Sequence, residues 1–324
     1  MYVQIARFFY LFFVANTNST YDIPDYVSDF WNKIVILGGC ENWTRPPIHG
    51  TLRWHADGRW RMMEQTSKVT QRFDFCSVRM ADKIYVIGGK TREGITRSVL
   101  RYDLRTYRLD GDVPDMLYPR FGGSAVVIDG KIYVFGGDTG SNDSMSQECM
   151  QSGEVFDGKT WKLIRKMNHK RLGSSAVVVD GRAVVMGGYD GNYHDSVEIY
   201  DPRSNEWSMP FPPMIQSRYA ASAVLYRNQI YIMGGFENGV LKSVERFDLN
   251  TREWESMSPM KSRRSGMCAV CYHGKILVMG GCDGGQNLIS CEEFDPLTET
   301  FSKASIRLQS NLALFCGHVV PDLP

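Results

Sequence analysis

A pair of adjacent glycines recurs six times along the chain, each time directly after a short apolar run. The pairs are Gly38-Gly39, Gly88-Gly89, Gly136-Gly137, Gly187-Gly188, Gly234-Gly235 and Gly280-Gly281. Their first glycines are 50, 48, 51, 47 and 46 residues apart. A constant period of this size indicates a repeat architecture in which each copy is one supersecondary unit.

A second pattern runs in the same register. An aromatic residue follows each glycine pair, and in most copies a tryptophan comes five to seven residues later. These aromatic pairs are Trp54/Trp60, Phe156/Trp161, Tyr200/Trp207 and Phe247/Trp254, with Phe294/Phe301 and the weakest copy, Tyr102/Leu109, in the same places. Large rings at these positions would fill the space between neighbouring sheets.

The apolar runs within each copy have the character of short β-strands. Residues 84–87 and 132–135 are apolar at every position, which predicts strands covered on both faces. Asp129-Gly130 and Asp180-Gly181 precede such runs and predict two-residue hairpin turns. Each copy is therefore expected to form four antiparallel strands, a to d, with the glycine pair at the end of strand b.

One such sheet cannot bury both of its faces, whereas a ring of sheets can. Six copies therefore predict an all-β, six-bladed propeller of four-stranded antiparallel blades. The glycines at the end of strand b would permit positive φ angles and a close backbone approach where the blades converge.

The glycine pair, the aromatic residue and the tryptophan together resemble the kelch repeat, and residues 190–207 are close to its consensus. The resemblance covers roughly residues 33–320, which we interpret as the propeller. Residues 1–32 would form an N-terminal extension, and residues 321–324 a tail. The resemblance implies that a partner binds on the face formed by the b–c loops and the d–a connections.

A conserved spacing within the chain predicts how the ring closes. Arginine stands sixteen residues before the first glycine in five copies, at Arg72, Arg120, Arg171, Arg218 and Arg264. The first copy has no strand a before its glycines, but residues 311–316 resemble one without its arginine. We expect this C-terminal strand to complete the first blade, because such closure removes an exposed sheet edge.

The five arginines, with Asn311, are candidates for partner binding around the mouth of the channel. Planar guanidinium groups match carboxylate or phosphate, so this interpretation predicts an acidic or phosphorylated partner segment. The alternative is that Glu154, Glu198, Glu245 and Glu292 neutralise arginines inside the scaffold. Leu52 and Leu100 stand where this glutamate belongs in the first two copies, so Arg72 and Arg120 are expected to lack a partner.

Aromatic residues in the loops are further candidates, because tyrosine, tryptophan and arginine dominate binding hot spots. They are Tyr189, Tyr193, Tyr219, Phe236 and Trp43. The alternative for each is packing against the adjacent loop.

The composition favours neither an enzyme nor a nucleic-acid binder. The net charge is +1, far from the strongly basic balance of a nucleic-acid-binding domain. None of the six histidines forms a short-spaced ligand pair, and Cys268 and Cys271 have no second pair to complete a metal site. We therefore expect no catalytic site, no metal and no cofactor.

Kelch propellers resembling this one often follow a BTB domain in substrate adaptors of cullin-RING ubiquitin ligases. The resemblance thus implies a protein-binding module of the adaptor type, in contact with a cullin only if a BTB domain is supplied elsewhere. The alternative is an actin-binding kelch protein; a secreted or galactose-oxidase-like protein is disfavoured. The apolar run at residues 8–15 is too short to span a bilayer. A cytoplasmic location is expected, with secretion as the alternative if this run is a signal peptide.

Overall fold

The structure is a computed structural model that describes residues 33–38, 52–54, 60–62, 72–106, 108–140 and 149–320. Every named element in this part of the chain is a β-strand. Within these ranges there is accordingly no helix with the length and apolar character needed to cross a membrane. The expected extension at residues 1–32 and the tail at 321–324 lie outside the described residues.

The strands form six four-stranded antiparallel sheets in the described part of the chain. Blade 1 contains β26 (Cys316–Val320), β1 (Lys33–Leu37), β2 (Leu52–Trp54) and β3 (Trp60–Met62). Blade 2 contains β4 (Cys76–Met80), β5 (Lys83–Ile87), β8 (Val99–Asp103) and β9 (Arg108–Leu109), and a two-stranded hairpin, β6 (Lys90–Thr91) and β7 (Gly94–Ile95), lies in its b–c loop. Blade 3 contains β10 (Ser124–Ile128), β11 (Lys131–Phe135), β12 (Gly153–Phe156) and β13 (Trp161–Leu163).

The last three blades repeat the same order. Blade 4 contains β14 (Ser175–Val179), β15 (Arg182–Met186), β16 (Val197–Asp201) and β17 (Glu206–Ser208). Blade 5 contains β18 (Ser222–Tyr226), β19 (Gln229–Met233), β20 (Val244–Asp248) and β21 (Glu253–Met257). Blade 6 contains β22 (Cys268–Tyr272), β23 (Lys275–Met279), β24 (Ser290–Asp295) and β25 (Thr300–Arg307).

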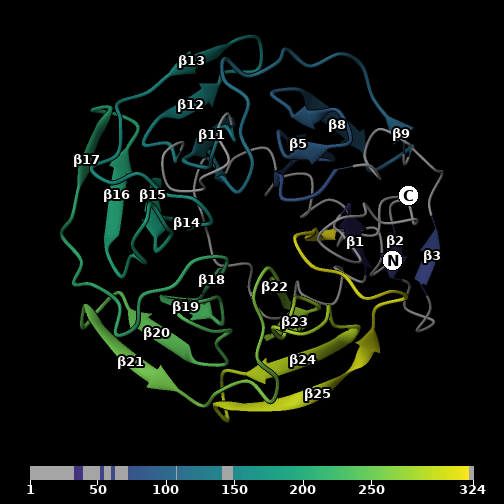
Figure 1. The fold of residues 1–324 in the computed structure, drawn as a ribbon, viewed down its shortest axis with the longest axis vertical. Coiled ribbons are helices and arrows are strands. Elements are labelled where there is room, and N and C mark those ends of the chain that lie inside the picture. The colour runs from purple at the N-terminus through teal and green to yellow at the C-terminus, as the bar shows by residue number, and fades with distance from the viewer. Residues whose placement is uncertain are drawn as a thin grey trace, which may run out of the picture.

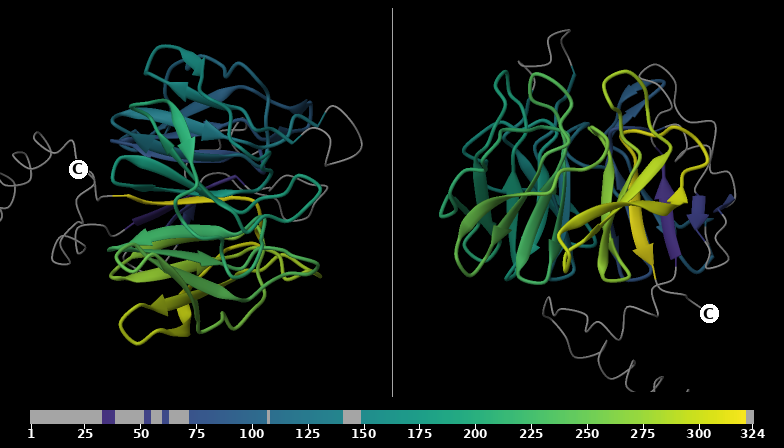
Figure 2. Two further views of the ribbon diagram at one scale, coloured as in Figure 1. Left: turned by 90° about the vertical axis from the view of Figure 1, so that its left-hand side faces the viewer. Right: turned by 90° about the horizontal axis from the view of Figure 1, so that it is seen from below.

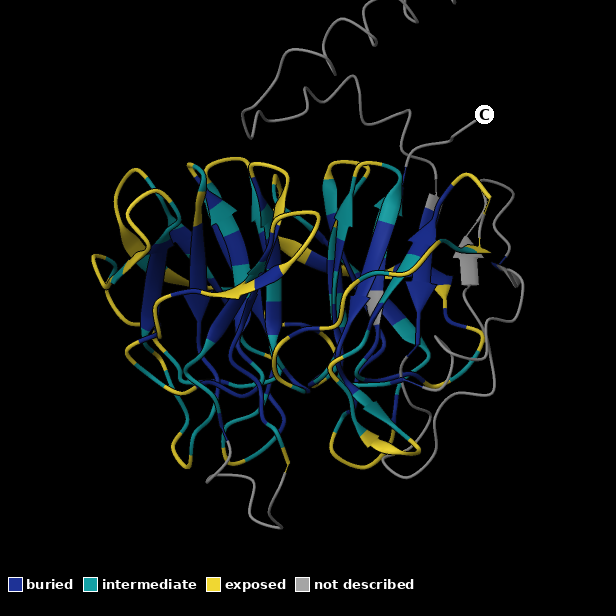
Figure 3. Cartoon of the chain, turned by 90° about the horizontal axis from the view of Figure 1, so that it is seen from above, coloured by how far each residue is buried: buried dark blue, intermediate teal, exposed yellow. Residues whose placement is uncertain are grey.

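The blades are arranged in a ring with strand a of each blade nearest the axis (Figure 1). Each inner strand contacts the inner strand of the next blade, and the circle is completed by contact of β26 with both β22 and β4. Side views show the loops gathered at the two ends of the ring (Figure 2). The middle of each blade is buried, and exposed residues lie in the loops at both ends (Figure 3). The predicted six-bladed propeller is confirmed.

The local features expected from the repeat are also confirmed. Asp129 and Gly130 have φ angles of 48° and 68°, as a two-residue hairpin turn between β10 and β11 requires. The six aromatic pairs face one another across strands c and d, as Phe156 and Trp161 do with ring centroids 5.1 Å apart.

The glycine pairs join neighbouring blades. A Cβ atom on Gly136 would lie 2.3 Å from the carbonyl oxygen of Arg171 in the next blade, so no larger residue fits without a shift. The amide of Gly137 donates a hydrogen bond of 2.7 Å to that same carbonyl. This is the close approach between blades that the sequence predicts.

Strand β26 completes blade 1 by pairing antiparallel with β1, with Ile34 opposite Val319 and Ile36 opposite Gly317. Closure by the C-terminal strand is therefore confirmed, but its predicted position at residues 311–316 is wrong. The strand runs from Cys316 to Val320. Residues 311–315 form the connection that precedes it, because in every complete copy strand a begins four residues after the arginine position, with three residues between them.

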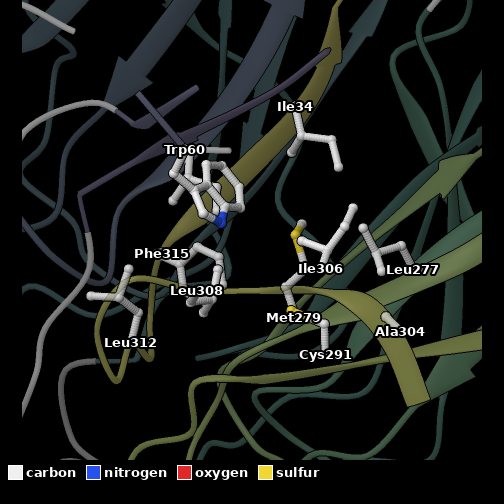
Figure 4. Packing of buried hydrophobic residues seen from close by; sticks show 11 residues of the cluster. Ile34, Trp60, Leu277, Met279, Cys291, Ala304, Ile306, Leu308, Leu312 and Phe315 are labelled. Carbon is white, nitrogen blue, oxygen red and sulfur yellow. The ribbon is translucent and has the colours of Figure 1, made fainter. Parts of the chain in front are cut away.

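The boundary between blades 6 and 1 is apolar like the others (Figure 4). Ile34 and Ile36 of β1 belong to the same buried cluster as Leu277 and Met279 of β23. The indole of Trp60 in β3 donates to the carbonyl of Arg307 at 2.5 Å. Trp161 makes the equivalent bond to Pro114 at 2.8 Å, so the seam between the two ends of the chain is built like an ordinary blade boundary.

Candidate functional site

One end of the ring carries both the b–c loops and the d–a connections, and we call this end the loop face. Its fully described b–c loops are residues 90–98, 189–195, 236–242 and 282–288, and its described connections are residues 110–119, 164–170, 209–217, 258–263 and 308–315. The opposite end carries the short a–b and c–d turns. Connecting segments on a rigid scaffold are the usual place for recognition, so the candidate site is sought on the loop face.

The predicted arginines lie at the base of this face, where they are buried. Arg120, Arg171, Arg218 and Arg264 each pair with a glutamate on strand c of the same blade. The pairs are Arg120–Glu154 at 2.7 Å, Arg171–Glu198 at 2.9 Å, Arg264–Glu292 at 3.0 Å, and Arg218–Glu245. Both side chains of the Arg171 pair are completely closed to solvent. The structure thus supports the scaffold interpretation of these arginines.

The expectation that Arg120 has no glutamate partner is wrong. Each arginine pairs with the glutamate that follows it within its own blade, so the leucine at position 100 affects Arg72 alone. Nη1 of Arg72 donates to the carbonyl of Ser98 at 2.9 Å, and no carboxylate of a described residue lies within ion-pair distance. Burial lowers the pKa of Arg72 to about 10, against the opposing charge of Asp115.

The buried glutamates also bind the backbone of the connection that enters their blade. Glu154 accepts hydrogen bonds from the amides of Leu117 at 2.7 Å and Tyr118 at 3.2 Å. The other three glutamates hold the equivalent two amides, those of Asn168 and His169, Ile215 and Gln216, and Lys261 and Ser262. Each arginine–glutamate pair therefore fixes one connection to its blade through charge-assisted hydrogen bonds.

The side chains of these fixed dipeptides project from the loop face. Leu117 is 44% exposed, Tyr118 46% and Ile215 58%, so these connections present large apolar side chains to solvent. Sequence reasoning missed them. They directly follow the buried methionines Met116 and Met214, which mark their place in the repeat. The repeat itself shows no preference for a residue type there.

Asn311 does not take the place of an arginine. Leu312 stands four residues before β26, where Arg120 stands before β10, and Leu312 is 2% exposed within the cluster between blades 6 and 1. Leu52 stands opposite Ile36 at the glutamate position of the same blade. Blade 1 has therefore lost both members of the charged pair, and Asn311 is an exposed residue of the connection.

Four of the five predicted aromatic residues come together on the loop face. Ring centroids are 5.1 Å apart for Tyr189 and Tyr193, 6.1 Å for Tyr193 and Tyr219, and 5.8 Å for Tyr219 and Phe236. All four side chains are half-buried. They pack against adjacent loops, as the alternative interpretation predicts, and still present ring surface to solvent. Trp43 lies outside the described residues.

A closed circle of backbone hydrogen bonds surrounds the axis beneath the loop face. It joins one residue from each blade, each donating its amide to the carbonyl of the preceding one, and these residues are Asp74, Gly122, Gly173, Ala220, Gly266 and Leu314. The bonds are 2.7 to 3.2 Å long, and all six residues have φ angles between 52° and 64°. Asp74 thus places a carboxylate at the axis, where most blades have a glycine or an alanine.

The described residues contain no group of three or more histidine, cysteine or carboxylate side chains that could hold a metal ion. Cys268 and Cys271 lie on β22, where their thiols donate to the carbonyls of Gly317 at 3.7 Å and Leu225 at 3.6 Å. His169 and His194 have ring centroids 5.1 Å apart, and Nε2 of His194 lies 3.2 Å from the carboxylate of Asp190. Burial lowers the pKa of His194, against the opposing effect of Asp190.

A family model described as the KLHDC2/KLHL20/DRC7 Kelch-repeats domain matches residues 27–213, 76–262 and 173–320. Kelch-like protein 15 of Danio rerio is 27% identical over 212 residues, which cover 57% of this chain and 34% of that protein. Kelch repeat and BTB domain-containing protein 12 of Danio rerio is 29% identical over 186 residues, covering 48% of this chain and 29% of that protein. The chain thus spans about a third of the length of these relatives.

The solved structure titled "Structure of YjhT" is similar in fold, with a TM-score of 0.66 and 15% identity over 75% of this chain and 86% of that one. The family model, the spacing of the repeats and the closed ring of blades agree. The chain therefore belongs to the kelch-repeat family.

Proposed function

We propose that this chain is a non-enzymatic protein-binding module that captures a partner segment on the loop face, as the substrate-recognition propeller of a cullin-RING ubiquitin ligase adaptor does. Kelch-repeat propellers are typically protein-interaction modules, which supports a binding role at the level of the family. One observation carries the choice of face: buried glutamates rigidly hold connections whose apolar side chains, Leu117, Tyr118 and Ile215, point into solvent.

One further observation supports the adaptor role. The relative named Kelch repeat and BTB domain-containing protein 12 has, by its name, the domain that accompanies kelch propellers in such adaptors.

We propose a partner chemistry other than the one that the arginines predict. Five arginines at the channel mouth predict an acidic or phosphorylated segment. Four of those guanidinium groups are paired with buried glutamates, and Arg72 donates to backbone and hydroxyl groups of its own blade. Because these guanidinium groups are buried and bonded within their own blades, we propose that the partner contacts the exposed side chains above them.

Affinity capture with matched surface variants tests the proposal. Leu117→Glu combined with Ile215→Glu adds two negative charges to the loop face. Leu297→Glu adds one to the c–d turn of blade 6, where Leu297 is 77% exposed, and each single loop-face variant is its charge-matched counterpart. We expect the loop-face variant to lose partners that the wild type and Leu297→Glu both retain. Equal recovery by all three proteins contradicts the proposal. Recovery of actin, followed by cosedimentation with filaments, would favour the cytoskeletal alternative.

A further inference from the structure

The four rings of Tyr189, Tyr193, Tyr219 and Phe236 form a continuous surface that we call the aromatic patch. Tyr193 contacts Tyr189, Tyr219 and Phe236 with centroid distances of 5.1, 6.1 and 6.0 Å. None of the three tyrosine hydroxyls makes a hydrogen bond to another described residue. The patch therefore offers half-exposed ring faces, which carry negative electrostatic potential, together with free phenolic oxygens.

Carboxylates stand directly beside the patch. Asp190 follows Tyr189 in one b–c loop, and Glu237 follows Phe236 in the next. Asp190 accepts from the amide of Asn192 at 3.2 Å, and Glu237 accepts from the side-chain amide of Gln216 at 3.0 Å. No lysine or arginine of the described residues forms an ion pair with either carboxylate.

Asp74 adds a third carboxylate from the axis. It makes no hydrogen bond or ion pair with its side chain to a described residue, and it acts electrostatically on the hydroxyl of Tyr219. Its pKa is raised to about 6 by burial and by Asp138, against the opposing charge of Lys90. Lys90 itself lies over the ring of Phe121, 3.6 Å from the centroid. A cation–π contact between Lys90 and Phe121 therefore already exists on the loop face.

We propose that the aromatic patch, with Asp190, Glu237 and Asp74, binds an arginine or lysine side chain of the partner segment. A cation above tyrosine rings gains cation–π attraction, and the neighbouring carboxylates supply negative charge, since no described lysine or arginine forms an ion pair with them. The inference rests on the proposed function, because it names the chemistry recognised on the same loop face. The partner residue proposed here is basic, whereas the arginines in the sequence predict an acidic or phosphorylated partner.

Selection from a displayed library of random twelve-residue peptides tests this inference. The wild-type propeller is expected to enrich peptides that share an arginine or lysine. The resynthesised peptide should lose at least tenfold in affinity when this residue is changed to glutamine, and more when it is changed to glutamate. Enrichment of acidic peptides, of uncharged apolar peptides, or of no peptide family overturns the inference.

Variants of the propeller test whether the basic residue of the selected peptide binds at the aromatic patch. Asp190→Asn with Glu237→Gln keeps the size of both side chains and an acceptor oxygen on each while removing their charge. Tyr193→Leu keeps an apolar side chain but removes the aromatic ring. Each is expected to weaken the selected peptide at least fivefold at low salt with an unchanged melting temperature. Glu253→Gln, on the exposed outer strand β21, removes one negative charge away from the loop face and should bind like the wild type.

The two proposals fail in different ways. If Leu117→Glu with Ile215→Glu abolishes peptide binding while the Asp190, Glu237 and Tyr193 variants bind normally, the loop face is correct and the basic-residue inference is wrong. If none of these variants affects binding, the proposed function on this face fails as well.

Discussion

Nη2 of Arg120 and Oε1 of Glu154 lie 2.7 Å apart, and both side chains are almost completely closed to solvent. The same carboxylate binds the amides of Leu117 and Tyr118 in the connection between blades 2 and 3. The pair therefore links the buried core of the blade to the connection on its surface. It determines where the exposed side chains of the connection stand.

Breaking one such pair should be more damaging than removing it entirely. Arg171→Leu or Glu198→Leu alone leaves one buried charge without its partner, which typically costs about 3–5 kcal/mol of unfolding free energy. The double variant should cost clearly less than the sum, because blade 1 already has Leu312 and Leu52 at the two positions. Denaturant titration of the four proteins measures the coupling. Strictly additive losses would show that the two charges do not stabilise each other.

Strand β26 should be essential for the closed ring. Deleting residues 308–324 removes the strand that pairs with β1 and also removes Leu308, Leu312 and Phe315 from the cluster between blades 6 and 1. The exposed edge of β1 should then cause aggregation or a large fall in melting temperature. Deletion of residues 321–324 alone is the control. An unchanged melting curve for the longer deletion would refute closure by this strand.

His318 should make the seam sensitive to acid. It lies on β26 with Nε2 2.7 Å from the hydroxyl of Ser77 in blade 2, and burial, with a smaller contribution from Arg79, lowers its pKa to about 4. The unfolded chain therefore binds a proton that the folded chain resists, and stability should fall as the pH drops from about 6.5 towards 4. His318→Gln should lack this component. Melting temperatures of the two proteins between pH 7.5 and 4.5 check it, and parallel curves would contradict it.

Asp74 should have the opposite pH dependence. Its pKa is raised to about 6, chiefly by burial, so the folded chain holds a proton that the unfolded chain releases near pH 4. Its ionisation should lower stability as the pH rises from about 4 to 6. Asp74→Asn should melt higher than the wild type at pH 7.5 and equally at pH 3.5, since the protonated acid and the amide are similar. A variant less stable at pH 7.5 would mean that the carboxylate is stabilising.

Asp74→Gly separates the backbone from the charge at the same position. Asp74 has a φ angle of 57°, and glycines with similar angles occupy the equivalent positions 122, 173 and 266. The variant should fold into the same ring, because glycine adopts this conformation without strain. If it also binds the selected basic peptide more weakly, the carboxylate contributes to recognition at the expense of stability. Unchanged affinity would remove Asp74 from the binding site.

The fold could be predicted from the sequence because each of its signals is periodic. Glycine pairs, aromatic pairs and arginines recur in register, and six copies predict the ring, its hairpins and its closure. The position of β26 is harder to predict, because the glycine pair of its blade, Gly38-Gly39, lies at the other end of the chain. The count of sixteen residues back from the first glycine cannot be applied to it. The count of four residues after the arginine position, applied to Leu312, would have placed it correctly.

The site was less accessible to sequence reasoning. Its residues occupy positions at which the repeat varies, so Leu117 and Ile215 carry no motif, and their exposure follows from hydrogen bonds to Glu154 and Glu245. The periodic arginines gave the stronger signal but belong to the scaffold. The aromatic candidates did come together, because the short b–c loops of blades 4 and 5 place Tyr193 against Tyr219.

Hydrogen–deuterium exchange of the propeller, with and without a partner obtained by affinity capture, tests the assignment of the binding face most directly. We predict that protection by the partner concentrates in residues 114–119, 189–195, 212–217 and 236–242, while the turns at 129–130, 180–181 and 296–299 at the opposite end exchange as before. Protection of those turns with no change on the loop face would contradict the account.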